Sequence, residues 1–264
     1  MPLVFVNGTT LNYRFDGPEQ GPIVMLSNSL ASDLTMWDSQ IPGLVKAGYR
    51  TLRYDSRGHG RSGVPAGPYS IEMLADDAVR LMDAFGLGRV HLCGLSMGGM
   101  VGQMLGARYS DRLLSLTLCS TAAHMPPREI WDERIETVSE KGMDAAVDAT
   151  IDRWFTTAGQ ERLKTEVTKI RSMILATPVK GFCACCEALQ DMDMRDPIRA
   201  IPTRTLIMVG EYDQGTPVSA ARFIHEQIAG SELRIIPDAA HFANVEQCDI
   251  FNEALLEFIG TEDT

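Results

Sequence analysis

The sequence predicts an α/β fold, a mostly parallel sheet with helices on both faces and a helical cap inserted between two of its strands. Short apolar runs alternate with helix-like segments in residues 1–121 and again in residues 201–264. Parallel strands require such an alternation, because each crossover between them usually contains a helix. Residues 122–200 are instead mostly helical, with interspersed charges and no convincing strand. We therefore expect a core formed by 1–121 and 201–264, and a cap formed by 122–200.

The elements before the cap follow from the spacing of apolar side chains. Alternating apolar residues around the turn Asn7-Gly8-Thr9 predict an N-terminal β-hairpin. Short apolar runs beyond it predict strands, and longer stretches with helical periodicity predict helices. In chain order these are strand Ile23–Leu26, helix Trp37–Ala47, strand Tyr49–Asp55, helix Ile71–Phe85, strand Val90–Cys93, helix Met97–Tyr109 and strand Leu113–Cys119.

Strands and helices alternate again after the cap. The expected elements are strand Thr205–Gly210, helix Ser219–Ala229, strand Leu233–Ile236 and helix Cys248–Ile259. A chain of 264 residues can bury one full core of this kind with a small insertion.

Charge and composition narrow the classes of function. The formal net charge of −11 argues against nucleic-acid binding and against an anionic membrane surface. The N-terminus has no basic region ahead of an apolar core, and the longest charge-free stretch, Val90 to Ala107, is broken by five glycines. We therefore expect a cytoplasmic protein that acts on a small molecule. The sequence leaves the oligomeric state open, a homo-oligomer included.

The cysteines give no sign of a metal or of a disulfide framework. Six are present, and Cys183, Cys185 and Cys186 are the only ones close together. No histidine lies near them in sequence, and a C-x-C-C pattern on a helix directs its thiols to different sides. We interpret them as small buried or half-buried thiols, and we expect chemistry without a metal or other cofactor.

The pentapeptide Gly94-Leu95-Ser96-Met97-Gly98 is the most informative motif. It lies between an expected strand and an expected helix, which is the context in which G-x-S-x-G presents a nucleophilic serine on a sharp turn. The two glycines leave room for the strained backbone and for the close approach of the helix. A Gly/Ser-rich turn without chemistry and a dinucleotide-binding loop are the alternatives. The turn around Ser96 and the helix after it, Gly94 to Gly106, contain no G-x-G-x-x-G that would support the second.

A serine nucleophile needs a base, and the base needs an orienting acid. His241 follows an expected strand and precedes the last helix, which is the setting of the base. His59, in an Arg-Gly-His-Gly turn, more simply braces its own loop. Asp213 follows strand Thr205–Gly210 and gives the chain order Ser, Asp, His. Asp238 is the alternative acid, although its place in the loop of His241 suits a role in shaping that loop.

Acyl transfer also needs two N–H donors directed at the developing oxyanion. The backbone amide of Met97, directly after the nucleophile, is one candidate. The other is expected from the loop after strand Ile23–Leu26, at Leu30. An ordinary turn at Ser29 and Leu30 is the alternative interpretation.

These residues lie in motifs that resemble the α/β-hydrolase superfamily and, within it, the 3-oxoadipate enol-lactonases of aromatic catabolism. The resemblance covers nearly the whole chain and is densest at Leu26–Leu30 with Met36-Trp37, Leu52–Gly60, Cys93–Gly99, Arg153–Phe155 with Glu129–Trp131, and His241–Gln247. The G-x-S-x-G turn at Ser96 and the Arg-Gly-His-Gly turn are shared by the whole superfamily. The Ser-Asn-Ser segment and the Arg-Trp-Phe of the cap are more specific to the lactonases.

The resemblance implies an α/β-hydrolase fold and the hydrolysis of a small, carboxylate-bearing enol-lactone. The substrate carboxylate would need a cation in the cap, and Arg134 and Arg153 are candidates, although arginines on helices often face solvent. Trp131 and Trp154 are expected either in the pocket or in the core of the cap, and Ser29 is a further candidate for substrate binding. Gln214-Gly215, after Asp213, and Phe-Ala-Asn, after His241, depart from the pattern of the family, so a different or bulkier lactone stays an alternative substrate.

Other activities use the same scaffold. A carboxylesterase, a hydrolase of a bulkier lactone and a hydrolase of carbon–carbon bonds share the serine, acid and histidine, and the fold does not separate them. A ligand receptor without activity is least favoured, because Ser96, Asp213 and His241 are all present.

Overall fold

The structure is a computed structural model that describes residues 2–260. An eight-stranded sheet with the order β1-β2-β4-β3-β5-β6-β7-β8 forms its centre. The first two strands pair antiparallel, β2 pairs antiparallel with β4, and every other neighbouring pair is parallel. The strands are β1 (Leu3–Val6), β2 (Thr9–Asp16), β3 (Ile23–Ser27), β4 (Arg50–Tyr54), β5 (Val90–Leu95), β6 (Leu113–Cys119), β7 (Thr205–Gly210) and β8 (Glu232–Ile236).

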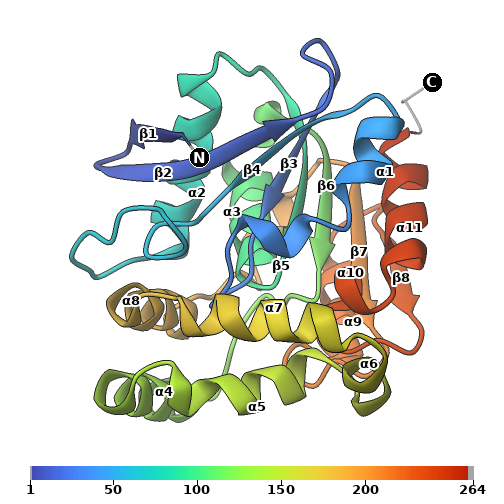
Figure 1. Cartoon of the computed structure of the whole chain (residues 1–264). Helices are drawn as coiled ribbons and strands as arrows, with labels where there is room; N and C mark the ends of the chain where they lie inside the picture. Colours follow the sequence, from blue (N-terminus) through green and yellow to red (C-terminus); the bar gives the residue numbers. More distant parts are fainter. Residues whose placement is uncertain (1, 261–264) are drawn as a thin grey trace.

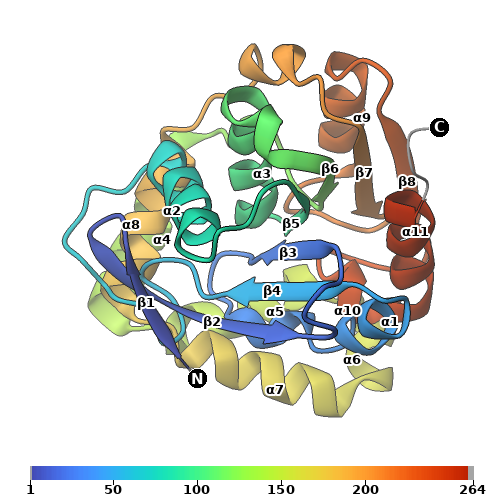
Figure 2. The same ribbon diagram turned by 90° about the horizontal axis from the view of Figure 1, so that it is seen from above.

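Helices cover both faces of this sheet (Figure 2). On one face lie α2, α3 and α9, and on the other lie α1 and α11. Their bounds are α1 (Ile41–Lys46), α2 (Ile71–Ala84), α3 (Met97–Arg108), α9 (Val218–Gln227) and α11 (Cys248–Gly260). All six residues of β7 are buried, as expected of a parallel strand covered on both faces. The α/β fold class predicted from the sequence is confirmed.

Five helices lie between β6 and β7 and form a separate layer at one end of the sheet (Figure 1). We call them the cap helices: α4 (Arg128–Lys141), α5 (Asp144–Trp154), α6 (Thr157–Arg162), α7 (Lys164–Leu175) and α8 (Val179–Gln190). Short 3₁₀ segments occur at Leu34–Trp37, Ser110–Arg112 and Pro197–Ala200, and the last of these packs against α3. The division of the chain at residues 122 and 200 stays a prediction.

The largest differences between the expected elements and the structure are at two places, and the other bounds agree to within two residues. Helix α1 begins at Ile41 rather than at Trp37, because Pro42 suits only the first turn of a helix and a 3₁₀ turn capped by Asp33 precedes it. A short helix, α10 (Ala243–Glu246), follows His241 and was not predicted. Its four residues are too few to show helical periodicity.

Within residues 2–260, no single helix is long and apolar enough to cross a membrane. Helices α7 and α8 satisfy the length and composition criteria only when taken together, and they are bent by 92° relative to each other.

Candidate active site

Ser96 occupies the turn between β5 and α3, with backbone angles φ 57° and ψ −114°. The left-handed φ is strained for a residue with a side chain. The N–H of Ser96 donates to the carbonyl of Cys119 over 2.8 Å, which fixes the turn to the end of β6. A Cβ at Gly94 would lie 2.1 Å from the carbonyl oxygen of Gly98, and one at Gly98 would lie 2.1 Å from that of Ser27. Only glycine fits at both positions, so the sharp strand-to-helix turn that the G-x-S-x-G motif predicts is present.

Asp213 and His241 meet through a hydrogen bond. His241 Nδ1 lies 2.8 Å from Asp213 Oδ2. Asp213 is 4% exposed, and its carboxylate also accepts the N–H groups of Gly215 and Thr216, both over 2.9 Å, and the Thr216 hydroxyl over 2.8 Å. Burial alone would raise the pKa of Asp213, but the positive charge of His241 and these hydrogen bonds together hold that pKa below its ordinary value. Asp213 therefore stays ionised beside the imidazole.

Thr216 was not among the residues singled out from the sequence. It stands three positions after Asp213, a spacing at which an aspartate side chain often accepts backbone N–H groups in a turn. The spacing of Asp213 and Thr216 could therefore have predicted the turn, but it could not have predicted the hydrogen bond from the Thr216 hydroxyl to Asp213 Oδ2. Asp238 lies in the loop before His241, where its carbonyl accepts a hydrogen bond from Gln247 over 3.0 Å.

The loop after β3 presents the amide expected to bind an oxyanion. The N–H of Ser29 donates to Met36 Sδ over 3.3 Å, and that of Ala31 donates to His59 Nε2 over 3.0 Å. Between them, the N–H of Leu30 has no hydrogen-bond partner within the described chain. Met97 is the first residue of α3, and the first N–H groups of a helix have no partner inside it. Leu30 also lines the cavity of Ser96, whereas Met97, directly after that serine, is fully buried.

His59 braces the Leu30 loop from the protein interior. Its ring is fully buried, and burial lowers the pKa of His59 to about 4. It is therefore neutral near pH 7, with Nε2 accepting from Ala31 and Nδ1 facing the carbonyl of Arg57 at 3.3 Å. His59 does not line the cavity that holds Ser96.

A cavity of about 300 Å³ brings the candidate residues together. Ser96 and His241 line it, as do all five residues proposed from the sequence for substrate binding: Ser29, Trp131, Arg134, Arg153 and Trp154. Much of the remaining wall is apolar and was not predicted: Met100, Met125, Ile130, Phe182 and Leu189. Both tryptophans are buried and also line the cavity. Each therefore belongs to the pocket and to the core of the cap, the two positions that the sequence left open.

The two cap arginines carry positive charge into this cavity. Arg134 lies over the ring of Trp131, with its guanidinium carbon 4.7 Å from the ring centre, and Arg153 donates to the Thr150 hydroxyl over 3.1 Å. Among residues 2–260, neither forms an ion pair with an acid. Burial, followed by the charge of Arg134, lowers the pKa of Arg153 to about 10. The nearby charge of Asp152 raises the pKa of Arg153 only in part, without forming an ion pair, and both arginines are cationic near neutrality.

Comparison with known proteins agrees with this geometry. A family model described as the alpha/beta hydrolase fold matches residues 22–247. The chain belongs to the α/β hydrolase family. It is 34% identical to 3-oxoadipate enol-lactonase 2 of Acinetobacter baylyi over 245 residues, which are 93% of this chain and 91% of that protein.

Solved structures of an enol-lactonase and of an esterase are also similar to this chain. The enol-lactonase of Burkholderia xenovorans LB400 superposes with a TM-score of 0.96 and 39% identity, over 98% of this hydrolase and all of that chain. A thermophilic esterase of Thermogutta terrifontis superposes with a TM-score of 0.93 and 29% identity, over 98% of each chain. These relatives support ester or lactone hydrolysis as the class of reaction.

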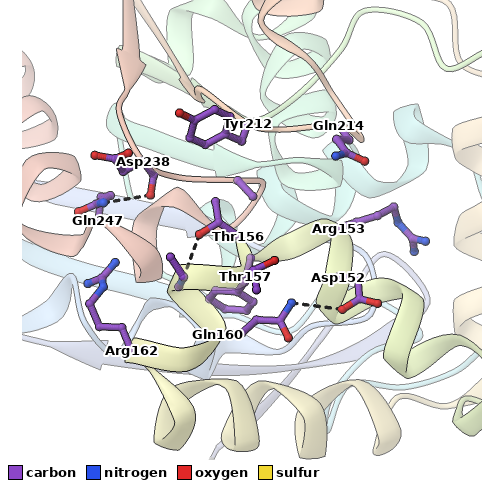
Figure 3. A pocket seen from close by; sticks show the side chains of 14 residues that line it. Asp152, Arg153, Thr156, Thr157, Gln160, Arg162, Tyr212, Gln214, Asp238 and Gln247 are labelled. Carbon is purple, nitrogen blue, oxygen red and sulfur yellow. Dashed lines mark hydrogen bonds between the residues drawn. The ribbon is translucent and has the colours of Figure 1, made fainter.

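A second, more open hollow of about 980 Å³ lies beside the cavity of the hydrolase (Figure 3). Arg153 and Gln214 line both spaces, whereas Ser96 and His241 line only the smaller one. Polar side chains such as Thr157 and Tyr212 surround the larger hollow. The larger space therefore does not reach Ser96 or His241, and it borders their cavity at Arg153 and Gln214.

The cysteines of α8 face different neighbours. Cys183 Sγ lies 3.4 Å from the Ser139 hydroxyl, and Cys185 Sγ lies 3.8 Å from the carbonyl oxygen of Arg57. In the part of the chain that the structure describes, no three His, Cys, Asp or Glu side chains are grouped to hold a metal ion.

Proposed function

We propose that this protein is a serine hydrolase that opens a small lactone bearing a carboxylate, similar to 3-oxoadipate enol-lactone, through an acyl-enzyme. The observation that carries the proposal is that Arg134 and Arg153, in the cavity that Ser96 and His241 line, form no ion pair within residues 2–260. Both side chains are half-buried, and a guanidinium partly removed from water without an ion-pair partner is costly. A carboxylate on the substrate would supply the missing charge through charge-assisted hydrogen bonds.

The proposed reaction begins with attack of the Ser96 hydroxyl oxygen on the lactone carbonyl. His241 takes the hydroxyl proton, and Asp213 holds the imidazole through Nδ1 and stabilises its charge. The N–H groups of Leu30 and Met97 stabilise the oxyanion. Cleavage of the ring C–O bond then gives an acyl-enzyme and an enol, which takes the proton from His241 and converts to a ketone.

Hydrolysis of the acyl-enzyme completes the cycle. His241 removes a proton from water, the resulting hydroxide adds to the acyl carbon, and the Ser96–acyl bond breaks as the serine recovers its proton. The product carries one more carboxylate than the substrate. The arginines retain the original carboxylate during both steps, so the acyl group stays oriented.

The size of the cavity favours a small substrate over a bulky one. Its volume of about 300 Å³ lies at the lower limit of ordinary ligand pockets. A carboxylesterase is the second candidate, because the Thermogutta esterase shares the fold at 29% identity. An uncharged ester has no group to pair with Arg134 and Arg153, so the arginines separate the two candidates.

The test is steady-state hydrolysis of 3-oxoadipate enol-lactone, of p-nitrophenyl acetate and of a macrolactone, with Ser96→Ala as the control. We expect kcat/KM to be much higher for the enol-lactone than for the ester or the macrolactone, and to be lost in the variant. Activity on the ester or the macrolactone without enol-lactone turnover would retain the serine mechanism and exclude the proposed substrate. Equal rates for wild type and Ser96→Ala would exclude the mechanism.

A further inference from the structure

Glu246, on α10, is a buried carboxylate that the proposed reaction does not use. It is 1% exposed. Its Oε1 accepts the N–H of Thr156 over 3.0 Å and the Thr156 hydroxyl, and its Oε2 accepts the N–H of Ala240 over 2.8 Å. Three donors thus offset the cost of burying the charge.

The donors of Glu246 belong to two different parts of the molecule. Thr156 is the N-cap of α6, where its hydroxyl accepts the N–H of Gly159 over 2.9 Å. Ala240 is the residue before His241. One side chain therefore joins the junction of α5 and α6 in the cap to the loop that carries the proposed base. Thr156 is labelled in Figure 3, where it lies between Asp238 and Gln247 on one side and Gln160 on the other.

The residue after His241 is attached to the same junction. The N–H of Phe242 donates to the carbonyl of Trp154 over 2.9 Å, and the two rings stack with their centres 3.9 Å apart. The backbone is thus held to residues 154–156 on both sides of His241. The attachment before His241 depends on the Glu246 side chain, whereas the attachment after it is a backbone hydrogen bond to Trp154. A substitution at Glu246 can therefore remove the first attachment without disturbing the cavity wall at Trp154.

The cap chain is shaped to admit this carboxylate. A Cβ at Gly159 would lie 1.9 Å from Glu246 Oε1, so a side chain at that position would displace Glu246. The main-chain carbonyl of Glu246 in turn accepts a hydrogen bond from Arg162, over 2.7 Å, at the end of α6. Both ends of α6 therefore contact Glu246.

We propose that Glu246 is a positioning residue, which aligns His241 by fixing its loop to the cap. Proton transfer and attack depend on the imidazole position so steeply that an error of about 1 Å costs on the order of 100-fold in rate. The inference rests on the proposed role of His241 as the base. It adds that the cap takes part in the chemical step through the histidine loop, in addition to binding the substrate.

The test compares Glu246→Gln, Thr156→Val and Thr156→Ser with the wild type. Glutamine has the shape of glutamate but places an NH₂ against a backbone N–H, and valine removes the threonine hydroxyl, whereas serine keeps it. Gln160→Ala is the matched control, because Gln160 is also on α6 but bonds Asp152 rather than the histidine loop. The substrate is p-nitrophenyl acetate, which has no carboxylate for the arginines to bind.

Four quantities are measured for each variant. They are kcat per active site titrated with a serine-reactive phosphonate, KM, the downfield proton resonance of His241 Nδ1, and Tm. We expect Glu246→Gln and Thr156→Val to lower kcat per site by about 10- to 100-fold with KM within threefold, and to shift or broaden the resonance. Thr156→Ser and Gln160→Ala should stay within threefold of wild type in both kinetic constants.

The outcomes separate this inference from the proposed function. A purely structural role would lower Tm and the titrated fraction, but would leave kcat per site and the resonance unchanged. If kcat per site stays within twofold of wild type in either Glu246→Gln or Thr156→Val, the positioning role is wrong. If His241→Ala and Ser96→Ala hydrolyse the ester as fast as wild type, the proposed function itself fails.

Discussion

The strand-borne catalytic candidates and the cap arginines are held by different kinds of contact. Asp213 has four donors of its own, and the Ser96 turn is fixed by a backbone hydrogen bond to β6. Within residues 2–260, Arg134 lies over a tryptophan ring and Arg153 donates to a threonine hydroxyl, and neither is in an ion pair. On the sheet side, which comprises Ser96, Asp213 and His241, the acid and the serine turn are therefore held by hydrogen bonds within the protein. On the cap side, the positive charge of the arginines is in no ion pair within residues 2–260. The two sides differ as a fixed group of candidate catalytic residues differs from a candidate recognition surface.

Removing the proposed nucleophile or the proposed base should have the largest effect on kcat, because neither serine attack nor proton transfer can then take place. We expect Ser96→Ala and His241→Ala each to lower kcat on the enol-lactone by about 10⁴-fold or more, with residual catalysis of roughly 10³-fold over water from binding and the oxyanion amides. Steady-state kinetics with a thermal melt of each variant provides the measurement. Near-wild-type kcat in His241→Ala would assign the proton transfer to another group.

Removing a cap arginine should damage recognition and leave the reaction centre intact. We expect Arg134→Met and Arg153→Met to lower kcat/KM for the enol-lactone by about 100-fold, since each deletes a charged partner of the substrate in a buried site. Hydrolysis of p-nitrophenyl acetate should stay within threefold. Arg171→Met is the control, because Arg171 pairs with Asp148 on the outer surface of the cap. An equal loss on both substrates would show that the arginines support the cap instead.

The sheet side was also the part that the sequence predicted best. Strands β6 and β7 have the predicted bounds, because short apolar runs between glycines and charges have few other ways to be buried. Ser96 follows from a motif whose glycines are needed for local backbone reasons. Local requirements of this kind are visible in a single stretch of sequence.

Contacts between distant segments could not be predicted in the same way. The hydrogen bonds of Glu246 join it to Thr156, 90 positions earlier in the chain, and neither residue lies in a pattern that indicates the other. The number of acids near Arg153 likewise depends on how the cap helices pack. Sequence motifs therefore indicated the candidate catalytic residues, but not the residues that hold them in place.

Acid should weaken the sheet side through His59, which supports the loop of Leu30. Burial lowers the pKa of His59 from its ordinary 6.5 to about 4, so between these values the unfolded chain binds a proton that the folded protein does not. Stability must then fall as pH decreases through this window. From pH 7 to pH 5 the loss due to His59 is about 2 kcal/mol.

Urea denaturation of the wild type and of His59→Gln at both pH values measures this contribution. The variant should be less stable at pH 7, because the bond to Ala31 is altered, but its stability should fall less on acidification. Burial also lowers the pKa of His91 to about 4, and His91 is present in both proteins, so the difference between their pH dependences isolates His59. Parallel pH dependences would mean that His59 is protonated in the folded protein.

A substitution at Thr216 should have the smallest effect, because only one of its two hydrogen bonds to Asp213 comes from its side chain. Thr216→Val removes the hydroxyl donor to Oδ2 but keeps the backbone N–H donor to Oδ1. We expect kcat to fall about 5- to 10-fold, corresponding to one hydrogen bond, with KM unchanged, while Thr216→Ser behaves as wild type. Loss of a donor should raise the folded-state pKa of Asp213 toward its unfolded value, so the variant should lose less stability than the wild type when the pH falls through the ordinary range of an aspartate. If valine and serine gave the same kcat, the backbone donors and His241 alone would suffice to hold the acid.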